Sequence, residues 1–249
     1  MTTTNDEMPF ITAICPTYRR PKLIPNVLAM WNAQTYPKEK RILLILDDGQ
    51  SFESQINLDE GWILLSINLR IKTLGAKFNL LVDSAIQQSD IVLFEDDDVY
   101  LPGYVEAHAK ILKEHHSSQP EFVWSNDAQG RTTLNKSNAV GRHHGAWGFS
   151  KEAYDEVGGY YGTMNHGFDT NLGSRFLALN HYPQDPFKER IEYIYRWQTS
   201  GYSNGSGWGD DIYEATERCH KPTKFEGELK PEFDEETAYY YSLYEMGNI

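Results

Sequence analysis

The stretch Ile91–Pro102, which reads IVLFEDDDVYLP, decides the fold. Its first four residues are apolar and rich in β-formers, a pattern that predicts a strand buried on both faces of a parallel sheet. The strand runs into four consecutive carboxylates. Because carboxylates repel one another and are costly to crowd together, such a cluster at a strand end favours a bound cation. In open α/β sheets, ligands bind just beyond the carboxyl ends of the strands.

A hard divalent ion, Mg²⁺ or Mn²⁺, suits this position, since such ions are held by one or two carboxylates together with substrate phosphates. The purely structural alternative is a solvated acidic turn that precedes the helix begun by Pro102, because carboxylates favour helix N-termini. The acidic stretch alone leaves both interpretations open.

Apolar runs and helical spacing alternate along the first half of the chain. Further strands are expected at 10–15, 41–46, 62–67, 121–125 and 193–197. Helices are expected from Pro21 to about 33, and at about 75–88, 102–116, 169–179 and 235–246. This alternation predicts an α/β fold with a Rossmann-like, mainly parallel sheet flanked by helices. We expect one domain over 8–215 and an acidic, Tyr-rich C-terminal extension over 216–249 that packs on it.

The bulk composition limits the function classes. The chain has 249 residues and a formal net charge of −13, which argues against broad adhesion to nucleic acid or anionic lipid. No apolar run approaches the roughly 18 residues that span a bilayer, and the first residues lack a signal-peptide pattern. The two cysteines cannot form a disulfide framework. A cytoplasmic protein without a membrane span is the simplest expectation.

Several motifs in order resemble those of the inverting family 2 glycosyltransferases, which have the GT-A fold. The resemblance covers about 10–197. Its landmarks are the loop Pro16-Thr17-Tyr18-Arg19, the turn Asp47-Asp48-Gly49, the helix start at 75–79, the acidic stretch, the segment 147–160 with its Val-Gly-Gly-aromatic turn, and the segment 167–175.

The resemblance implies a nucleotide site made by the first three landmarks. Pro16, Thr17, Tyr18 and Arg19 would contact the nucleotide. Asp48 would accept the imide N–H of uracil, a donor that cytosine lacks; an ordinary Asp-Gly turn is the alternative. Lys77 would contact the nucleotide or its diphosphate as a point charge, unless it is a solvated helix lysine.

The acidic stretch corresponds to the Asp-x-Asp motif of that family. The family spaces the last motif aspartate five positions before a helix-starting proline, and Pro102 therefore selects Asp97 as the metal ligand. Asp96 would contact the ribose or a metal-bound water, Asp98 would be a reserve ligand, and Glu95 replaces the usual first aspartate. The metal would neutralise the diphosphate leaving group.

Asp169 corresponds to the general base of the family, which removes the proton of the acceptor hydroxyl. Arg175 keeps the family spacing of six positions, whereas Phe168 stands where many relatives have a second acid. The structural alternative is that Asp169 only caps a helix. In the Val-Gly-Gly segment the glycines are expected to serve the turn. Trp147 could stack on a sugar, but a place in the core suits it equally well.

The expected activity is transfer of a sugar, with inversion, from a nucleotide sugar (most simply a UDP-sugar) to an acceptor hydroxyl. The acceptor could be a saccharide, a protein, or a modified base in viral DNA. That last acceptor would need a local basic patch, for example around Arg131, Lys136, Arg142 and His143. The alternatives are a nucleotidyltransferase, which the glycine-free loop after the first strand disfavours, and a catalytically silent nucleotide- or sugar-binding module.

Two further features are open. Any of five histidines (143, 144, 166, 181 and 220) could be a metal ligand or contact a diphosphate, although His143 and His144, if adjacent on a strand, would point to opposite faces. The segment from Tyr195 through the Gly-rich loop to Asp211 could form a lid over the donor.

Overall fold

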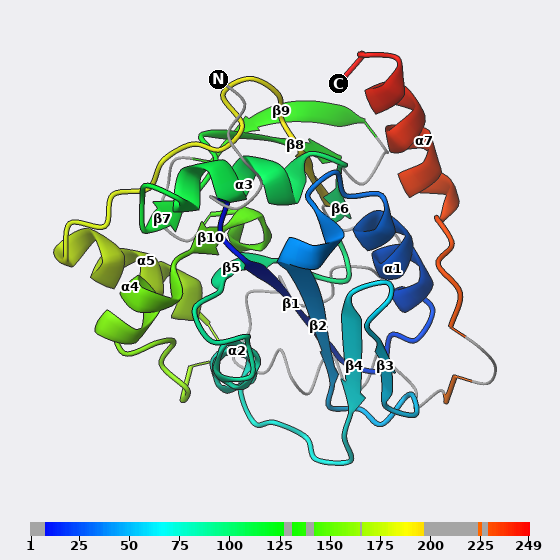
Figure 1. Ribbon diagram of the computed structural model, residues 1–249, viewed down its shortest axis with the longest axis horizontal. Coiled ribbons are helices and arrows are strands. Elements are labelled where there is room, and N and C mark those ends of the chain that lie inside the picture. The colour runs from blue at the N-terminus through cyan, green and yellow to red at the C-terminus, as the bar shows by residue number, and fades with distance from the viewer. Residues whose placement is uncertain (1–7, 127–130, 138–141, 165, 197–223, 226–228) are drawn as a thin grey trace.

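The computed structural model describes residues 8–126, 131–137, 142–164, 166–196, 224–225 and 229–249. Two sheets organise this part of the chain (Figure 1). The larger has seven strands in the order β3-β4-β2-β1-β5-β10-β7, and the smaller has four in the order β6-β11-β8-β9. The strands of the larger sheet are β1 (Ile11–Thr17), β2 (Arg41–Asp47), β3 (Gln55–Asn57), β4 (Trp62–Ser66), β5 (Asp90–Leu93), β7 (Ser117–Ser118) and β10 (Gly148–Phe149).

The four central strands β4, β2, β1 and β5 are parallel, as the continuous apolar runs predict. Their side chains alternate between two separate cores. Ala13 and Cys15 of β1 belong to one core, while Ile14, between them, belongs to the other. Because parallel strands share one direction, the carboxyl ends of β1, β2 and β5 lie at the same edge of the sheet.

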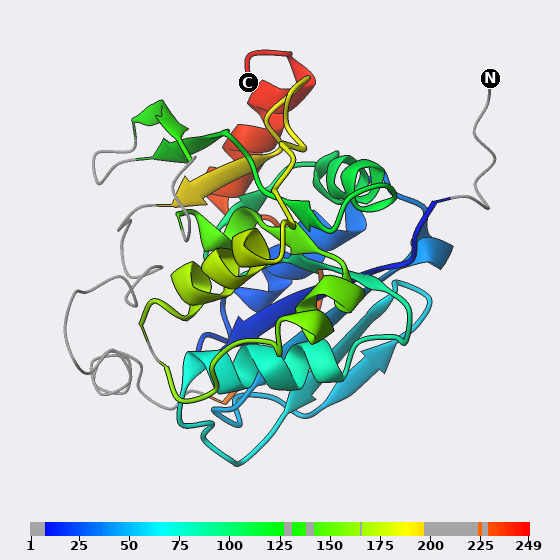
Figure 2. The ribbon, with the colours of Figure 1, turned by 90° about the vertical axis from the view of Figure 1, so that its left-hand side faces the viewer.

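Helices cover both faces of the large sheet. On one face, Figure 2 shows α2 (Leu74–Asp83) alongside α4 (Lys151–Glu156) and α5 (Phe168–Ala178). On the other face lies α1 (Ile24–Asn32), with α3 (Tyr104–Leu112) nearby (Figure 1). The helix α2 ends at Asp83, earlier than the expected residue 88. Two short 3₁₀ turns are also present, η2 (Lys38–Lys40) and η3 (His144–Ala146).

The small sheet begins where the acidic stretch ends. Its strands are β6 (Val99–Tyr100), β8 (Phe122–Asn126), β9 (Thr132–Lys136) and β11 (Tyr193–Arg196). β6 directly follows Asp98 and pairs antiparallel with β11. Therefore the four carboxylates lie on the connection between the large and the small sheet.

The helix α7 (Glu235–Glu245) at the C-terminus packs beside α1 (Figure 1). Its N-cap, Asp234, forms an ion pair with the fully buried guanidinium of Arg196, at 3.0 Å. The backbone N–H of Asp234 also donates to Asn26 Oδ1 of α1, at 3.1 Å. Tyr241 Oη donates to the carbonyl of Tyr100, at 2.7 Å. The end of the chain is thus tied to β11, to α1 and to β6, the strand that follows the acidic stretch. The expected boundary at 215/216 lies outside the described residues.

Two sequence expectations concern chemistry outside the site. Cys15 is a free, buried cysteine of β1, whereas Cys219 lies outside the described residues. Within the described part of the chain, none of the helices has the length and apolar character needed to cross a membrane.

Candidate functional site

Three neighbouring strands deliver polar residues to one edge of the large sheet. β1 ends at Thr17, β2 ends at Asp47, and β5 leads through Phe94 into the four carboxylates. Thr17 Oγ1 donates to Asp96 Oδ2, at 2.6 Å, and Lys77 Nζ donates to the carbonyl of Thr17. The predicted nucleotide loop therefore joins the acidic stretch on one side to α2 on the other.

Three of the four carboxylates converge. Glu95, Asp97 and Asp98 each offer an oxygen, and these oxygens lie within 4.8 Å of one another. Gly145, opposite them, leaves room: a Cβ there would lie 2.9 Å from Asp98 Oδ2 and 3.0 Å from Glu95 Oε2. An anionic, all-oxygen donor set is what Mg²⁺ and Mn²⁺ prefer, so these residues fit a divalent ion.

The four carboxylates have different surroundings, because the chain turns at each of them. Asp96 faces β1, where it accepts hydrogen bonds from Thr17 and from Arg20 Nη1, the latter at 2.8 Å. The same Arg20 nitrogen lies 3.1 Å from Asp97 Oδ2. Asp98 faces β11, where Tyr193 Oη donates to one oxygen and the Arg196 backbone N–H to the other, at 2.9 Å.

The crowding of these carboxylates is visible in their pKa values. Burial raises the pKa of Asp97 to about 7; Arg20 opposes this shift, and Asp96 and Glu95 add to it. Burial, together with Asp97 and Glu95, also raises the pKa of Asp98 well above its usual range, although Tyr193 and Arg196 oppose the shift. Without a cation, this cluster holds protons at pH values where isolated aspartates are ionised.

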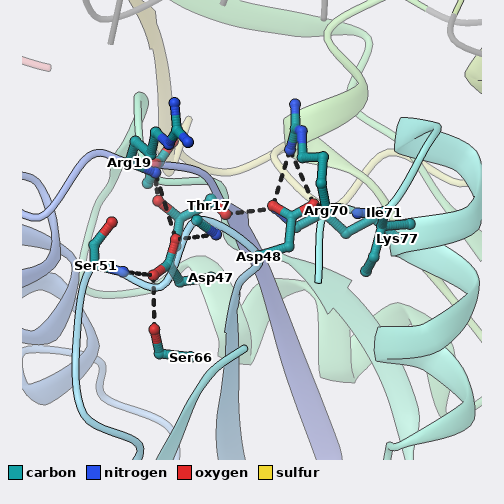
Figure 3. A network of polar contacts seen from close by, with 11 residues as sticks. Thr17, Arg19, Asp47, Asp48, Ser51, Ser66, Arg70, Ile71 and Lys77 are labelled. Atoms are coloured by element: carbon teal, nitrogen blue, oxygen red, sulfur yellow. Dashed lines mark hydrogen bonds and ion pairs between the residues drawn. The ribbon is translucent and has the colours of Figure 1, made fainter. Parts of the chain in front are cut away.

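The turn after β2 contains two aspartates with different partners (Figure 3). Asp47 holds the local backbone: it accepts from the N–H groups of Gly49 and Ser51 and from Ser66 Oγ, at 3.0, 2.6 and 2.8 Å. Asp48 points the other way, toward Arg70 and α2. Asp47 therefore holds the turn, and Asp48 takes no part in holding it.

Asp48 lies between two cations. Arg70 Nη1 lies 2.9 Å from each carboxylate oxygen, and Lys77 Nζ lies 2.6 Å from Oδ1. The backbone N–H of Ile71 donates to Oδ2, at 2.9 Å. Lys77 is only 2% exposed, so the alternative of a solvated helix lysine does not describe it. Burial lowers the pKa of Lys77, although Asp48 opposes the shift.

Tyr18 and Arg19 complete the predicted nucleotide loop. Arg19 has a left-handed backbone (φ 53°), and its N–H lies 3.4 Å from Asp47 Oδ1. The ring of Tyr18 is 7% exposed, with the guanidinium carbon of Arg70 3.5 Å from its centroid and that of Arg19 4.9 Å away. Pro16 belongs to β1 and is half-buried.

Asp169 lies in the first turn of α5, where the N-cap residue is Gly167. It is therefore not the N-cap itself. Its Oδ1 accepts the N–H of Thr170, at 2.7 Å, and within the described part of the chain it has no ion pair. Phe168, in place of the family's second acid, is buried and stacks on Phe78 at 5.6 Å, which fixes the start of α5 against the core.

His144 and Tyr160 lie between Asp169 and the acidic cluster. His144 Nδ1 is 3.5 Å from Glu95 Oε1, and His144 Nε2 is 2.8 Å from Tyr160 Oη. Burial raises the pKa of Tyr160, and the charges of Glu95 and Asp169 add to the shift. Since both carboxylates act on one hydroxyl, the proposed base and the acidic cluster belong to one region.

The segment 147–160 is structural. Trp147 is buried, 1% exposed, in the core rather than presented to a ligand. Arg175 donates to the carbonyls of Val157 and Gly159 and so holds the Val-Gly-Gly turn closed. Gly158 and Gly159 both have left-handed backbones, which explains the two glycines. Asn79 closes the same turn through Tyr160.

One of the four residues of the predicted basic patch is neutral. Arg131, Lys136 and Arg142 are exposed, but burial, with Arg142 adding to it, lowers the pKa of His143 to about 4, so this histidine adds no charge at neutral pH. His143 and His144 lie at the 3₁₀ turn η3, not on a strand as considered above.

The predicted lid, from Tyr195 to Asp211, is only partly described by the structure. Tyr195 and Arg196 form part of β11, and the rest of the expected lid lies outside the described residues.

Sequence reasoning missed two site cations, Arg20 and Arg70, and gave Tyr193 no role. Arg20 directly follows the loop Pro16–Arg19, which is predicted to lie near the carboxylates. A cation next to that loop was the sequence feature from which its role could have been predicted. Arg70 and Tyr193 lie 22 and 95 positions from their aspartate partners. Nothing local in the sequence marks them.

Comparison with solved structures identifies the fold. S. aureus TarS 1–349 in complex with UDP-GlcNAc matches with a TM-score of 0.60 and 14% identity, over 84% of this chain and 65% of that one. A second structure of S. aureus TarS matches with a TM-score of 0.58 and 13% identity, over 75% of this chain and 36% of that one. The mannosyltransferase PcManGT from Pyrobaculum calidifontis, in complex with GDP-Man and Mn²⁺, matches with a TM-score of 0.54 and 17% identity, over 78% and 59%.

The chain therefore has the GT-A fold, as its sequence motifs predict. It spans between 36% and 65% of the length of these solved chains. No protein-family model matches it. No curated protein sequence matches it either.

Proposed function

We propose that this protein is a metal-dependent, inverting glycosyltransferase that uses a UDP-sugar as donor. The observation that carries this proposal is the convergence of Glu95, Asp97 and Asp98 at the carboxyl end of a central parallel strand of a GT-A fold. Structures of the same fold have been solved with UDP-GlcNAc, and with GDP-Man and Mn²⁺. Fold alone does not establish activity, so the proposal depends on the residues of this site.

The donor is assigned to the edge formed by β1, β2 and β5. Asp48 would accept the imide N–H of uracil. The neighbouring Asp47 holds the turn through its hydrogen bonds with Gly49 and Ser51. Pro16, Thr17, Tyr18, Arg19 and Lys77 would surround the nucleotide, and Asp96 the ribose. Asp97, with Asp98 and Glu95, would hold the divalent ion, which when bound neutralises charge on the diphosphate leaving group.

The chemistry requires one base and one direction of attack. Asp169 would take the proton of the acceptor hydroxyl as the acceptor oxygen forms its bond to the anomeric carbon. The bond from that carbon to the diphosphate oxygen breaks at the same time, and the configuration inverts. The position of Asp169 supports this role: it is partly exposed, has no ion pair in the described chain, and its charge, like that of Glu95, raises the pKa of the Tyr160 hydroxyl.

The acceptor class follows less directly. A saccharide, a protein or a modified nucleic-acid base each offers the hydroxyl that Asp169 needs. The cations of the exposed patch (Arg131, Lys136 and Arg142) are fewer than the sequence pattern allowed, because His143 is neutral. This weakens the nucleic-acid option, and saccharide acceptors are the first to screen.

Calorimetric titration of UDP, CDP, GDP and ADP, each with and without Mn²⁺, tests the proposal. We expect UDP to bind in the presence of Mn²⁺, and to bind more tightly than CDP by about tenfold, because N3 of cytosine carries no hydrogen to donate to Asp48. Screening of UDP-sugars with saccharides would then identify the reaction. Absence of metal-dependent binding for all four nucleotides would contradict the proposal and favour a different chemistry on this fold.

A further inference from the structure

One guanidinium covers both groups that would hold the donor base. Arg70 places its guanidinium carbon 3.5 Å from the centroid of the Tyr18 ring, and its Nη1 lies 2.9 Å from both oxygens of Asp48. The side chain of Asp48 is 0% exposed, and Tyr18 is 7% exposed. Figure 3 shows Arg70 reaching down onto the Asp48 carboxylate. The proposed base-reading aspartate and its neighbouring aromatic ring are therefore closed to a nucleotide in this state.

A guanidinium shares three properties with a nucleobase. It is planar, donates N–H bonds in its plane, and stacks on an aromatic ring through its face. A uracil ring placed between Tyr18 and Asp48 would use the same three properties, with its imide N–H directed at the carboxylate. Arg70 thus makes, within the protein, the two contacts that a base would make.

The carboxylate of Asp48 has no acceptor capacity left for a base. A carboxylate offers about four lone-pair sites. Lys77 Nζ and Arg70 Nη1 lie on Oδ1, while the Ile71 N–H and Arg70 Nη1 lie on Oδ2. A base that donates to Asp48 must therefore displace one of these three donors.

Arg70 is the donor best able to leave. The Ile71 donor is part of the backbone, and Lys77 is buried and also bonded to the carbonyl of Thr17. Arg70 lies on the irregular segment between β4 and α2, and its side chain is 24% exposed. When Arg70 leaves, Asp48 keeps its ion pair with Lys77, so no buried charge is left without a partner.

We propose that Arg70 is a latch on the donor site: it occupies the place of the donor base and must leave Tyr18 and Asp48 before a nucleotide binds. This inference rests on the proposed function, since it takes the same edge of the sheet as the donor site. Its consequence is that the apparent affinity for the nucleotide equals the intrinsic affinity reduced by the fraction of molecules with the latch open. The imide N–H of uracil replaces the lost donor, whereas N3 of cytosine carries no hydrogen.

Arg70→Met tests the latch, because methionine keeps an unbranched apolar stem and removes the guanidinium. Lys72→Met is the matched control: Lys72 is exposed, two residues away, and its loss changes the net charge equally. We expect the Arg70 variant to bind UDP with Mn²⁺ about tenfold more tightly than the Lys72 variant, the gain for a latch that is closed about nine-tenths of the time. We expect its preference for UDP over CDP to be kept. Arg70→Gln, which is polar and shorter, should show the same direction if the methionine variant does not fold.

Three results would overturn the latch. Weaker UDP binding than in the Lys72 variant, with UDP and CDP becoming equal, would mean that Arg70 reads the base itself. Equal binding in both variants would mean that Arg70 takes no part in the donor site. Absence of Mn²⁺-dependent nucleotide binding in the wild-type protein and in every variant would remove the proposed function, and the latch with it.

Discussion

Asp169→Asn lowers the turnover number for sugar transfer by about 10²–10⁴-fold, the usual contribution of a general base. Asparagine keeps the size of the side chain but cannot accept the acceptor's proton. Asp169 lies on α5, and Asp48 lies on the turn after β2. The affinity for UDP should therefore stay within about twofold of the wild type, a change in binding free energy of less than about 0.5 kcal/mol. Release of UDP in the presence of acceptor measures the first quantity, and calorimetry measures the second.

Asp155→Asn is the control for this variant. Asp155 is an exposed carboxylate on the neighbouring helix α4, paired only with Lys151 of its own helix in the described structure. Its replacement should leave transfer unchanged. If Asp169→Asn also transfers sugar at the wild-type rate, then Asp169 has no part in the mechanism and the exposed position at the start of α5 is only structural.

Asp97→Asn removes metal-dependent donor binding. Since loss of a residue that merely supports a metal ligand costs about 10–100-fold in metal affinity, loss of a ligand should weaken Mn²⁺-dependent UDP binding by about 100-fold or more. The variant should fold, because Arg20 keeps its 2.8 Å contact with Asp96. Titration of UDP at a fixed Mn²⁺ concentration is the measurement.

Asp59→Asn provides the matched control, since Asp59 is exposed in the turn before β4, far along the chain from the acidic stretch. Near-normal Mn²⁺-dependent binding in Asp97→Asn would show that the choice of register by Pro102 is wrong. The ligands would then have to be sought in Glu95 and Asp98, which share the convergent cluster.

The central sheet could be predicted because its signal is local. Strands β1, β2 and β5 are buried on both faces, so each appears in the sequence as a mainly apolar run. β4 is buried mainly on the face of Trp62 and Leu64, but Ile63 and Leu65 on its other face are apolar too, so it gives the same signal. The small sheet could not be assembled in the same way. β9 is polar apart from Leu134, and β6 has two residues, too few for a periodic pattern. β7 and β10, at the edge of the large sheet, are equally short and escape prediction for the same reason.

The site was predictable to the extent that carboxylates after strands mark it. Asp48, Asp97 and Asp98 were named from their positions, and the structure brings them to the same edge of the sheet; their roles stay predictions. The partners of these residues are another matter. In the sequence Lys77 looks like an ordinary helix lysine, because its partner Asp48 is 29 positions away. Arg70 and Tyr193 acquire a role only from the folded geometry.

Phe168 shows how a departure from a family pattern can have a packing cause. The sequence has an aromatic residue at 168, where many members of the family that it resembles have a second acid. In the structure Phe168 packs against Phe78 and lies 5.4 Å from the ring of His144, the residue that contacts Glu95. An aromatic residue there anchors the helix that presents Asp169, so the replacement is consistent with the proposed base.

The central claim is that the acidic stretch holds the donor's diphosphate through a divalent ion. Electron paramagnetic resonance of Mn²⁺ bound to the protein with UDP labelled with ¹⁷O on its β-phosphate measures this contact directly. The account predicts broadening of the Mn²⁺ lines by the labelled oxygen in the wild-type protein and none in Asp97→Asn. Mn²⁺ bound to the wild-type protein with UDP present, but with lines that the label leaves unchanged, would contradict it.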